Sequence, residues 1–307
     1  MLQKGELVHN GSPYRTFFRV HHFKLSQVNN MNLKGSISAV LISFFMSSGL
    51  VWAQDSDTYH PMLTDTFVLG VGAFWAAESM EIEVDGSTPG DEFDFNEALN
   101  LDDNKTTGAM NFKWRFGEKW SLQGQYWSLD NSGGGELEDP IKWGDITFKE
   151  GTFAKGGVDK SVARIFFGRT FSTSNRHEFG LGAGFHWMEL DLFLEGQILT
   201  SEGDTEFYRG DADAAFPLPN VGGWYLFSWS SKWLMQARLD WLSASVGDYS
   251  GGLWNAQLGI NYQAFEHVGF GLYYNAFVVD VDVDKTDWRG KAESTQHGPF
   301  LAVTFNW

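Results

Sequence analysis

The chain of 307 residues contains no cysteine. This absence excludes disulfide bonds, cysteine-ligated zinc, a thiol nucleophile and a lipid anchor on an N-terminal cysteine. Basic residues are also scarce, because 22 Lys and Arg stand against 39 Asp and Glu, for a formal net charge of −17. The acidic balance argues against nucleic acid as a partner, since its phosphates require Lys and Arg.

Long apolar runs are missing after residue 53, so no segment there has the ~18 apolar residues of a transmembrane helix. The chain is rich instead in glycine and aromatic residues, with 35 Gly, 27 Phe and 14 Trp beside only 7 Pro. Such a composition suits an antiparallel β protein better than a helical one.

The N-terminal region is typical of a targeting signal. Residues 31–53 carry one positive charge at Lys34, continue through the apolar run 37–46 and end in the small residue Ala53. This order predicts a secretory signal peptide cleaved between Ala53 and Gln54. The alternative, a membrane anchor, needs more apolar residues than this run supplies to cross ~30 Å of hydrocarbon.

The rest of the chain is expected to divide into three parts. Residues 1–30 show no periodicity, so we expect translation to start at Met31; the alternative is an extended region ahead of the signal. Residues 54–63 are predicted to be a periplasmic lead-in, and residues 64–307 a single barrel domain.

Apolar and polar residues alternate with a period of two along much of the chain, which indicates β-strands with one face in an apolar medium. In residues 253–264, for example, Trp254, Leu258 and Tyr262 share one face. Ten segments are predicted as strands: 67–76, 108–116, 120–129, 162–171, 178–187, 222–229, 233–241, 253–264, 268–279 and 299–307.

These segments have the length that a tilted strand needs to cross a bilayer, and their apolar faces often end in Trp, Tyr or Phe. We therefore predict an all-β fold: a single antiparallel up-and-down transmembrane β-barrel of about ten strands, within a range of about 8–12. Its apolar face points to lipid and its interior is polar. A soluble lipocalin-like or sandwich fold is the alternative, with the apolar faces turned inward.

The connections alternate in length. Short ones follow residues 116, 171, 229 and 264, whereas residues 85–105, 130–157, 190–217 and 284–297 are predicted to be long loops. Short periplasmic turns and long external loops are typical of bacterial outer-membrane barrels. We therefore expect both barrel termini in the periplasm and the long loops outside the cell.

The last eight residues, 300–307, alternate apolar positions and end in the aromatic residues Phe305 and Trp307. This ending resembles the C-terminal strand signature of Gram-negative outer-membrane barrels of the OmpA-like/OmpW-like type. The resemblance implies recognition of Phe305 and Trp307 by the barrel-assembly machinery. The chain also resembles barrels that have an acidic element, a glycine-rich turn and a Phe-Pro-x-Pro segment. In this chain these are residues 94–97, 247–251 and 216–219. This resemblance implies no activity.

Acidic residues gather in the first predicted loop and include Asp91, Glu92, Asp94, Asp102 and Asp103. Residues 85–104 contain no Lys or Arg. Carboxylates suit divalent cations, so these residues are weak candidates for Ca²⁺ binding beside lipopolysaccharide. The alternative is a solvated, repelling loop.

Three further acids, Asp280, Asp282 and Asp284, alternate along one strand and are expected on its lipid-side face, just above the membrane. The positions that follow do not match a calcium-binding EF-hand loop.

An enzyme requires an acid, base or nucleophile within hydrogen-bond reach. His186 lies on a predicted interior face, far along its strand from Glu178, and His297 could face Asp282 only on the outside. We expect no catalytic site and no cofactor; a lipid- or peptide-modifying enzyme is the weaker alternative.

The predicted interior carries polar and charged side chains that either line a solute pathway or fill the barrel. They are Lys113, Arg115, Gln123, Gln125, Arg164, Glu178, His186, Gln236, Arg238, Asp240, Asn255, Gln257 and Asn261. A barrel of about ten strands leaves little space beyond its side chains, which favours a filled interior. The favoured function is a structural or surface-interaction role in the outer membrane, in contact with its lipid and lipopolysaccharide; a small-solute channel is the alternative.

Overall fold

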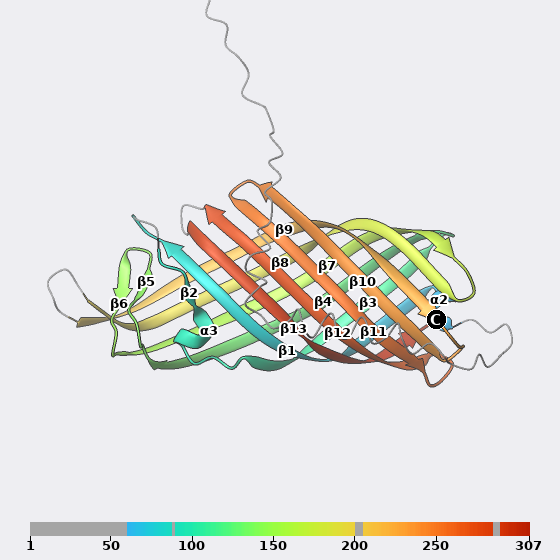
Figure 1. Ribbon diagram of the computed structural model, residues 1–307, viewed down its shortest axis with the longest axis horizontal. Helices are drawn as coiled ribbons and strands as arrows, with labels where there is room; N and C mark the ends of the chain where they lie inside the picture. The colour runs from blue at the N-terminus through green and yellow to red at the C-terminus, as the bar shows by residue number, and fades with distance from the viewer. Residues whose placement is uncertain (1–59, 88–89, 200–204, 285–288) are drawn as a thin grey trace, which may run out of the picture. The chain divides into compact units, whose positions relative to one another are not determined.

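The computed structural model describes residues 60–87, 90–199, 205–284 and 289–307. The predicted signal peptide, its cleavage site at Ala53 and Gln54, and residues 1–30 lie outside this part of the chain. Ten long strands dominate the described residues (Figure 1). They are β1 (Phe67–Asp85), β3 (Asn104–Phe116), β4 (Trp120–Glu136), β7 (Phe153–Thr173), β8 (His177–Leu199), β9 (Thr205–Ser228), β10 (Trp233–Val246), β11 (Tyr249–Gln263), β12 (Val268–Asp284) and β13 (Arg289–Asn306).

The ten strands close into one antiparallel ring. Each pairs with its neighbour in the chain, and the first and last strands, β1 and β13, pair from Val68↔Asn306 to Asp85↔Arg289. Strands β8 and β9 complete the ring on the other side. The predicted all-β, up-and-down barrel of ten strands is therefore confirmed. No helix among the described residues is long and apolar enough to span a membrane.

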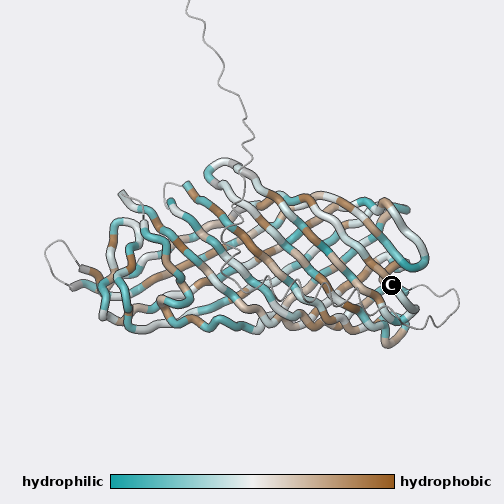
Figure 2. Tube along the Cα trace, viewed as in Figure 1, coloured by the Kyte–Doolittle hydropathy of each residue, from teal (hydrophilic) through white to brown (hydrophobic). Residues whose placement is uncertain are grey.

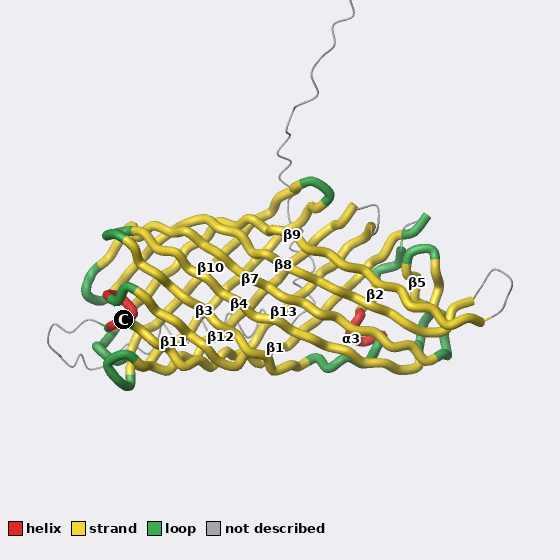
Figure 3. Tube along the Cα trace, turned by 180° about the vertical axis from the view of Figure 1, so that it is seen from behind, coloured by secondary structure: helices red, strands yellow, loops and turns green. Residues whose placement is uncertain are grey.

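The two ends of the barrel differ. At one end, which we call the turn end, four short connections follow β3, β7, β9 and β11, and Phe67 and Trp307 exchange backbone hydrogen bonds. The opposite loop end carries β2 (Phe93–Asp94), α3 (Phe95–Ala98) and the hairpin of β5 (Ile141–Trp143) and β6 (Ile146–Phe148) (Figures 1 and 3). The helix α2 (Pro61–Thr64) lies at the turn end, near the C-terminus.

The strands run much further than the sequence predicted. Residues 130–136, 153–157, 190–199, 205–217 and 289–297 were expected in loops, and they are strand instead. At the loop end, β10 and β11 meet in the glycine-rich turn of residues 247–251, where Gly247 has a positive φ of 61°, which favours glycine. The barrel wall therefore extends well past the predicted strand ends.

The extensions were missed because the apolar face changes sides along strands such as β8 and β12. In β8 the exposed outer residues are Phe179, Phe185 and Trp187, but beyond Trp187 the apolar side chains Leu190 and Leu194 are buried inside. The acidic residues of the same segment then lie on the outside. In Figure 2, hydrophilic residues accordingly gather towards the end opposite the C-terminus. The part of the barrel with a lipid-facing exterior thus continues, beyond Trp187, into a part whose exterior faces water.

An aromatic band marks the apolar exterior. Trp233 and Trp241 on β10, and Phe179 and Trp187 on β8, are all more than a third exposed and lie on the outer face. Each pair is separated by eight residues, or ~27 Å along a strand. A tilt of about 40° reduces this to ~21 Å along the barrel axis, close to the ~25 Å apolar band of membrane barrels. The exterior therefore matches a lipid bilayer in both chemistry and height.

The loop end has an apolar interior. Phe95 and Leu99, from the segment around α3, are fully buried inside the ring and pack against inward-facing strand residues. These strand residues include Met80, Ile82, Val84, Val158, Leu190, Leu192, Val279, Val281 and Val283. Within the described residues, this core closes the barrel at its loop end.

Among the described residues, strand β9 has an unpaired edge at the loop end. It pairs with β8 along its whole length, but with β10 only from Val221 to Ser228. The Phe-Pro-x-Pro segment, residues 216–219, therefore lies inside β9 rather than at the entry to a strand. Pro217 and Pro219 lack an N–H donor, which makes this edge a poor template for another strand.

Candidate functional site in the barrel interior

All thirteen polar residues that were predicted for the interior lie on the inward-facing side of their strands. Lys113 and Arg115 are partly exposed there, whereas Arg164, Glu178, His186, Asp240 and Asn261 are almost fully buried. The charged residues gather in layers that follow one another along the barrel axis.

The layer nearest the turn end surrounds Glu178. Its carboxylate pairs with Lys113 and accepts hydrogen bonds from Arg115 at 2.8 and 3.2 Å and from the Trp224 indole. Arg115 also donates to the backbone oxygens of Met62 and Asp65, both at 2.6 Å. Because Met62 belongs to α2, the hydrogen bonds from Arg115 hold α2 against this ionic layer at the turn end.

The middle layer is built on a bidentate ion pair. Arg164 donates to both oxygens of Asp240, from Nε at 2.6 Å and from Nη2 at 2.9 Å. Arg238 lies beside this pair, 3.7 Å from Asp240, and donates from Nη2 to Gln125 at 2.6 Å. These contacts connect strands that are not neighbours in the ring, since the residues come from β4, β7 and β10.

A third layer was missed at the sequence level. The side chains of Lys160 and Glu78 are both 0% exposed and form an ion pair at 2.5 Å. Ser294 accepts a further hydrogen bond from Lys160 at 2.7 Å, and Gln296 donates to Glu78 at 3.1 Å. A signal was present: Lys160 shares its strand face with Arg164, so its side chain has to point inward as well.

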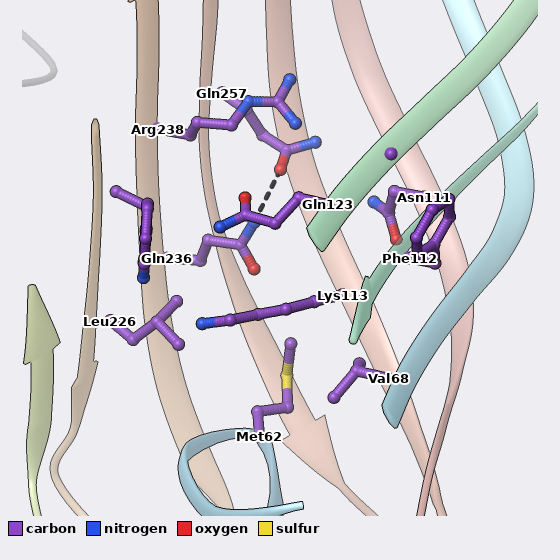
Figure 4. Close-up of a pocket in the computed structure, with 12 residues that line it drawn as sticks. Met62, Val68, Asn111, Phe112, Lys113, Gln123, Leu226, Gln236, Arg238 and Gln257 are labelled. Atoms are coloured by element: carbon purple, nitrogen blue, oxygen red, sulfur yellow. Dashed lines mark hydrogen bonds between the residues drawn. The ribbon is translucent and has the colours of Figure 1, made fainter. Parts of the chain in front are cut away.

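A cavity of about 50 Å³ lies between the turn-end and middle layers. Lys113 and Met62 approach it from one side, and Arg238 and Gln257 from the other (Figure 4). Gln236 lies between them and donates to Gln257 at 2.8 Å. The walls thus combine two cations and several amides with an apolar part that includes Val68, Phe112 and Leu226.

The acidic residues of the first predicted loop do not form one site. Asp94 accepts a hydrogen bond from the Glu97 backbone as the N-cap of α3, and Asp102 pairs with Lys105 at 2.9 Å. The backbone oxygen of Asp103 accepts from the amide of Glu78, and Asp91 is exposed. Calcium binding by this set stays a prediction.

Glu92 instead joins a cluster with Glu81 and Glu293 in which the three carboxylates lie within 4.8 Å of one another. Lys291 contacts Glu293 and lies 3.9 Å from Glu92, so the cluster contains its own cation. Asp280 faces outward next to it, as predicted, opposite Glu293 on β13. Burial raises the pKa of Asp280 to about 6; the charge of Lys291 opposes this shift, and the neighbouring carboxylates add to it.

A second acidic feature lies just beyond the aromatic band. Asp130, Asp159, Asp191 and Asp213 stand directly opposite one another on β4, β7, β8 and β9. All four are exposed, and we call them the aspartate row. Burial and the adjacent carboxylates raise the pKa of Asp191. Like charges directly opposite each other destabilise a sheet, so this arrangement opposes folding.

The two candidate histidines lie apart from the predicted acids. His186 is fully buried and contacts the Asn255 amide at 2.8 Å, and His297 contacts the hydroxyl of Tyr274 at 2.7 Å. Asp282 pairs in register with Lys291, not with His297. Neither histidine therefore has a carboxylate positioned to orient it.

The C-terminal aromatics face outward at the turn end. Phe305 and Trp307 are 38% and 59% exposed, and Trp307 packs on Phe67 with ring centroids 4.8 Å apart. Their recognition by assembly machinery stays a prediction.

No protein-family model matches the chain, and no curated protein matches its sequence. Solved structures similar to this chain over most of their length include the following three. The toluene transporter TodX of P. putida has a TM-score of 0.36 and 9% identity, over 81% of this chain and 92% of that chain. The outer membrane protein OprG from Pseudomonas aeruginosa has a TM-score of 0.32 and 10% identity, over 81% and 99%.

The third, the attachment invasion locus protein Ail of Yersinia pestis, has a TM-score of 0.24 and 9% identity, over 77% and 98%. Identities this low transfer no ligand, partner or activity to the present chain. The resemblance to the OmpA-like/OmpW-like type stays a prediction.

Proposed function

We propose that this protein is an outer-membrane β-barrel with a closed lumen, which acts through the acidic outer face of its projecting part. The observation that carries the proposal is the change of face beyond Trp187. Within the aromatic band the outer side chains are apolar. Above the band the outer side chains are acidic and the inner side chains are apolar. In a Gram-negative envelope the turn end would lie in the periplasm and the loop end outside the cell.

The chemistry of this face favours divalent cations as intermediaries. The aspartate row lies only a few residues above the aromatic band, at the height of lipid headgroups. Oxygen ligands from several carboxylates suit Ca²⁺ and Mg²⁺, and such ions also neutralise anionic phosphates of lipopolysaccharide. The proposed role is to anchor the barrel laterally to lipopolysaccharide through shared cations.

A binding experiment tests this role. We expect Ca²⁺ to raise the unfolding temperature of the refolded protein in lipopolysaccharide-containing vesicles, and the double variant Asp159→Asn/Asp191→Asn to lose most of that increase. The matched control is Glu118→Gln/Glu266→Gln, which removes two exposed acids from the turn end. An equal response to Ca²⁺ in both variants would contradict the proposal.

A gated small-solute channel is the second candidate, favoured by the cavity between two ionic layers. Conduction would require α2 to leave the turn end, and Phe95 and Leu99 to leave the loop end. These segments are held by buried contacts, so the closed form is the ground state in this proposal.

A further inference from the structure

The interior has more positive than negative charge. Five cationic side chains of the described interior, Lys113, Arg115, Lys160, Arg164 and Arg238, accompany three carboxylates, Glu78, Glu178 and Asp240. The Lys160 and Glu78 pair is balanced. The excess therefore lies in the other two layers, one positive charge in each. The carboxylate of Asp65 at the turn end is not included in this count, because it is only half-buried and accepts a hydrogen bond from Asn306.

Arg238 is the cation without a carboxylate of its own. Both oxygens of Asp240 are taken by Arg164, and Arg238 lies outside hydrogen-bond distance of Asp240 at 3.7 Å. Its side chain is only 5% exposed, and its Nε, the atom nearest Asp240, has no hydrogen-bond partner among the described residues. Two buried guanidinium groups thus share one carboxylate, which favours a further anion nearby.

The cavity of about 50 Å³ lies where an anion would be close to the excess positive charge of both layers. Lys113 and Arg238 line it from opposite sides, together with the amide side chains of Asn111, Gln123 and Gln236. A water molecule needs a cavity of ~10–15 Å³, so the space suits a halide or an anion of three or four heavy atoms. It excludes larger polyhydroxy acids such as gluconate.

We propose that the barrel interior holds a binding site for one small monovalent anion, between Lys113 and Arg238. The bound anion would neutralise one of the two excess positive charges and, placed between them, would interact favourably with both ionic layers. This site is independent of the acidic outer face and of the surface role proposed above.

Exchange of salts tests the site. The refolded protein is unfolded in urea in sodium chloride and in sodium gluconate at equal ionic strength. Chloride at ten times its Kd raises the folding equilibrium constant about 11-fold, and the increase saturates with concentration. We expect Arg238→Gln to lose this increase and Lys155→Gln, which removes an exposed cation of the outer face, to retain it. Equal stability in both salts, or an unchanged chloride effect in Arg238→Gln, would overturn the proposal.

A direct measurement covers the case in which Arg238→Gln does not fold. Crystals of the unaltered protein soaked in sodium bromide should give an anomalous peak in the cavity, beside Arg238 or Lys113. Bromide peaks confined to the protein surface would overturn the proposal.

Discussion

Replacement of Lys160 by methionine should strongly destabilise the barrel. The Lys160 and Glu78 side chains are both 0% exposed, and their 2.5 Å ion pair is joined by Ser294 and Gln296. Methionine has a similar length and removes the charge, so Glu78 is left buried without its cation. Loss of one partner of a buried pair typically costs about 3–5 kcal/mol. The free energy of unfolding of Lys160→Met should fall by that amount.

The double variant Lys160→Met/Glu78→Leu separates charge from packing. With both charges gone, no unpaired carboxylate remains, and replacement of a buried pair by apolar residues is often neutral or stabilising. We therefore expect the double variant to recover most of the lost stability in urea unfolding of the refolded protein. The control is Asp211→Asn, which breaks a solvent-exposed contact with Arg209 and should leave stability unchanged. A small loss in Lys160→Met, or an equal loss in the double variant, would refute the reasoning.

Three further predictions concern other parts of the barrel. The pKa of Asp280 is raised to about 6, so the folded state binds more protons than the unfolded state between about pH 4 and 6, and stability should increase as the pH falls through 6. Asp280→Asn should weaken this pH dependence in urea unfolding; an unchanged profile would show that other groups cause it. Phe95→Ala should destabilise the loop-end core by about 3–5 kcal/mol and accelerate proteolysis there, while equal protease resistance would contradict burial of the ring. Gly180→Val should cost about 1–3 kcal/mol by overpacking, because a Cβ at that position would lie 2.1 Å from Trp224; a variant as stable as the parent in urea would show that the indole moves freely.

The alternation of residues was sufficient to predict the barrel. It gave the all-β class, ten strands, the short turns and the inward direction of residues such as Arg164 and Asp240, because in a strand each side chain's face follows from its position. The aromatic residues near the ends of apolar faces distinguished a lipid-facing barrel from a soluble one.

The length of the strands could not be recognised by the same rule. Beyond Trp187 the alternation continues, but the apolar residues move from odd to even positions, so the template of a lipid-facing strand stops matching there. The aspartate row was missed for this reason, since all four members lie outside the predicted strands. A search that allows the apolar face to change sides would have found these extensions.

The partners within the interior depend on the closure of the ring. Glu78 and Lys160 are 82 residues apart and come from β1 and β7, which are not adjacent strands. No local pattern connects them. The sequence could place each charge inside the barrel, but the choice of partner required the three-dimensional arrangement of all ten strands.

Single-channel recording in a planar bilayer tests the closed lumen most directly. With the interior filled by three layers of buried ion pairs and an apolar loop-end core, the refolded protein should insert as a heat-modifiable, β-rich barrel and give no conductance steps. Reproducible steps that scale with salt and shift in Arg238→Ala would contradict the closed lumen and establish a channel.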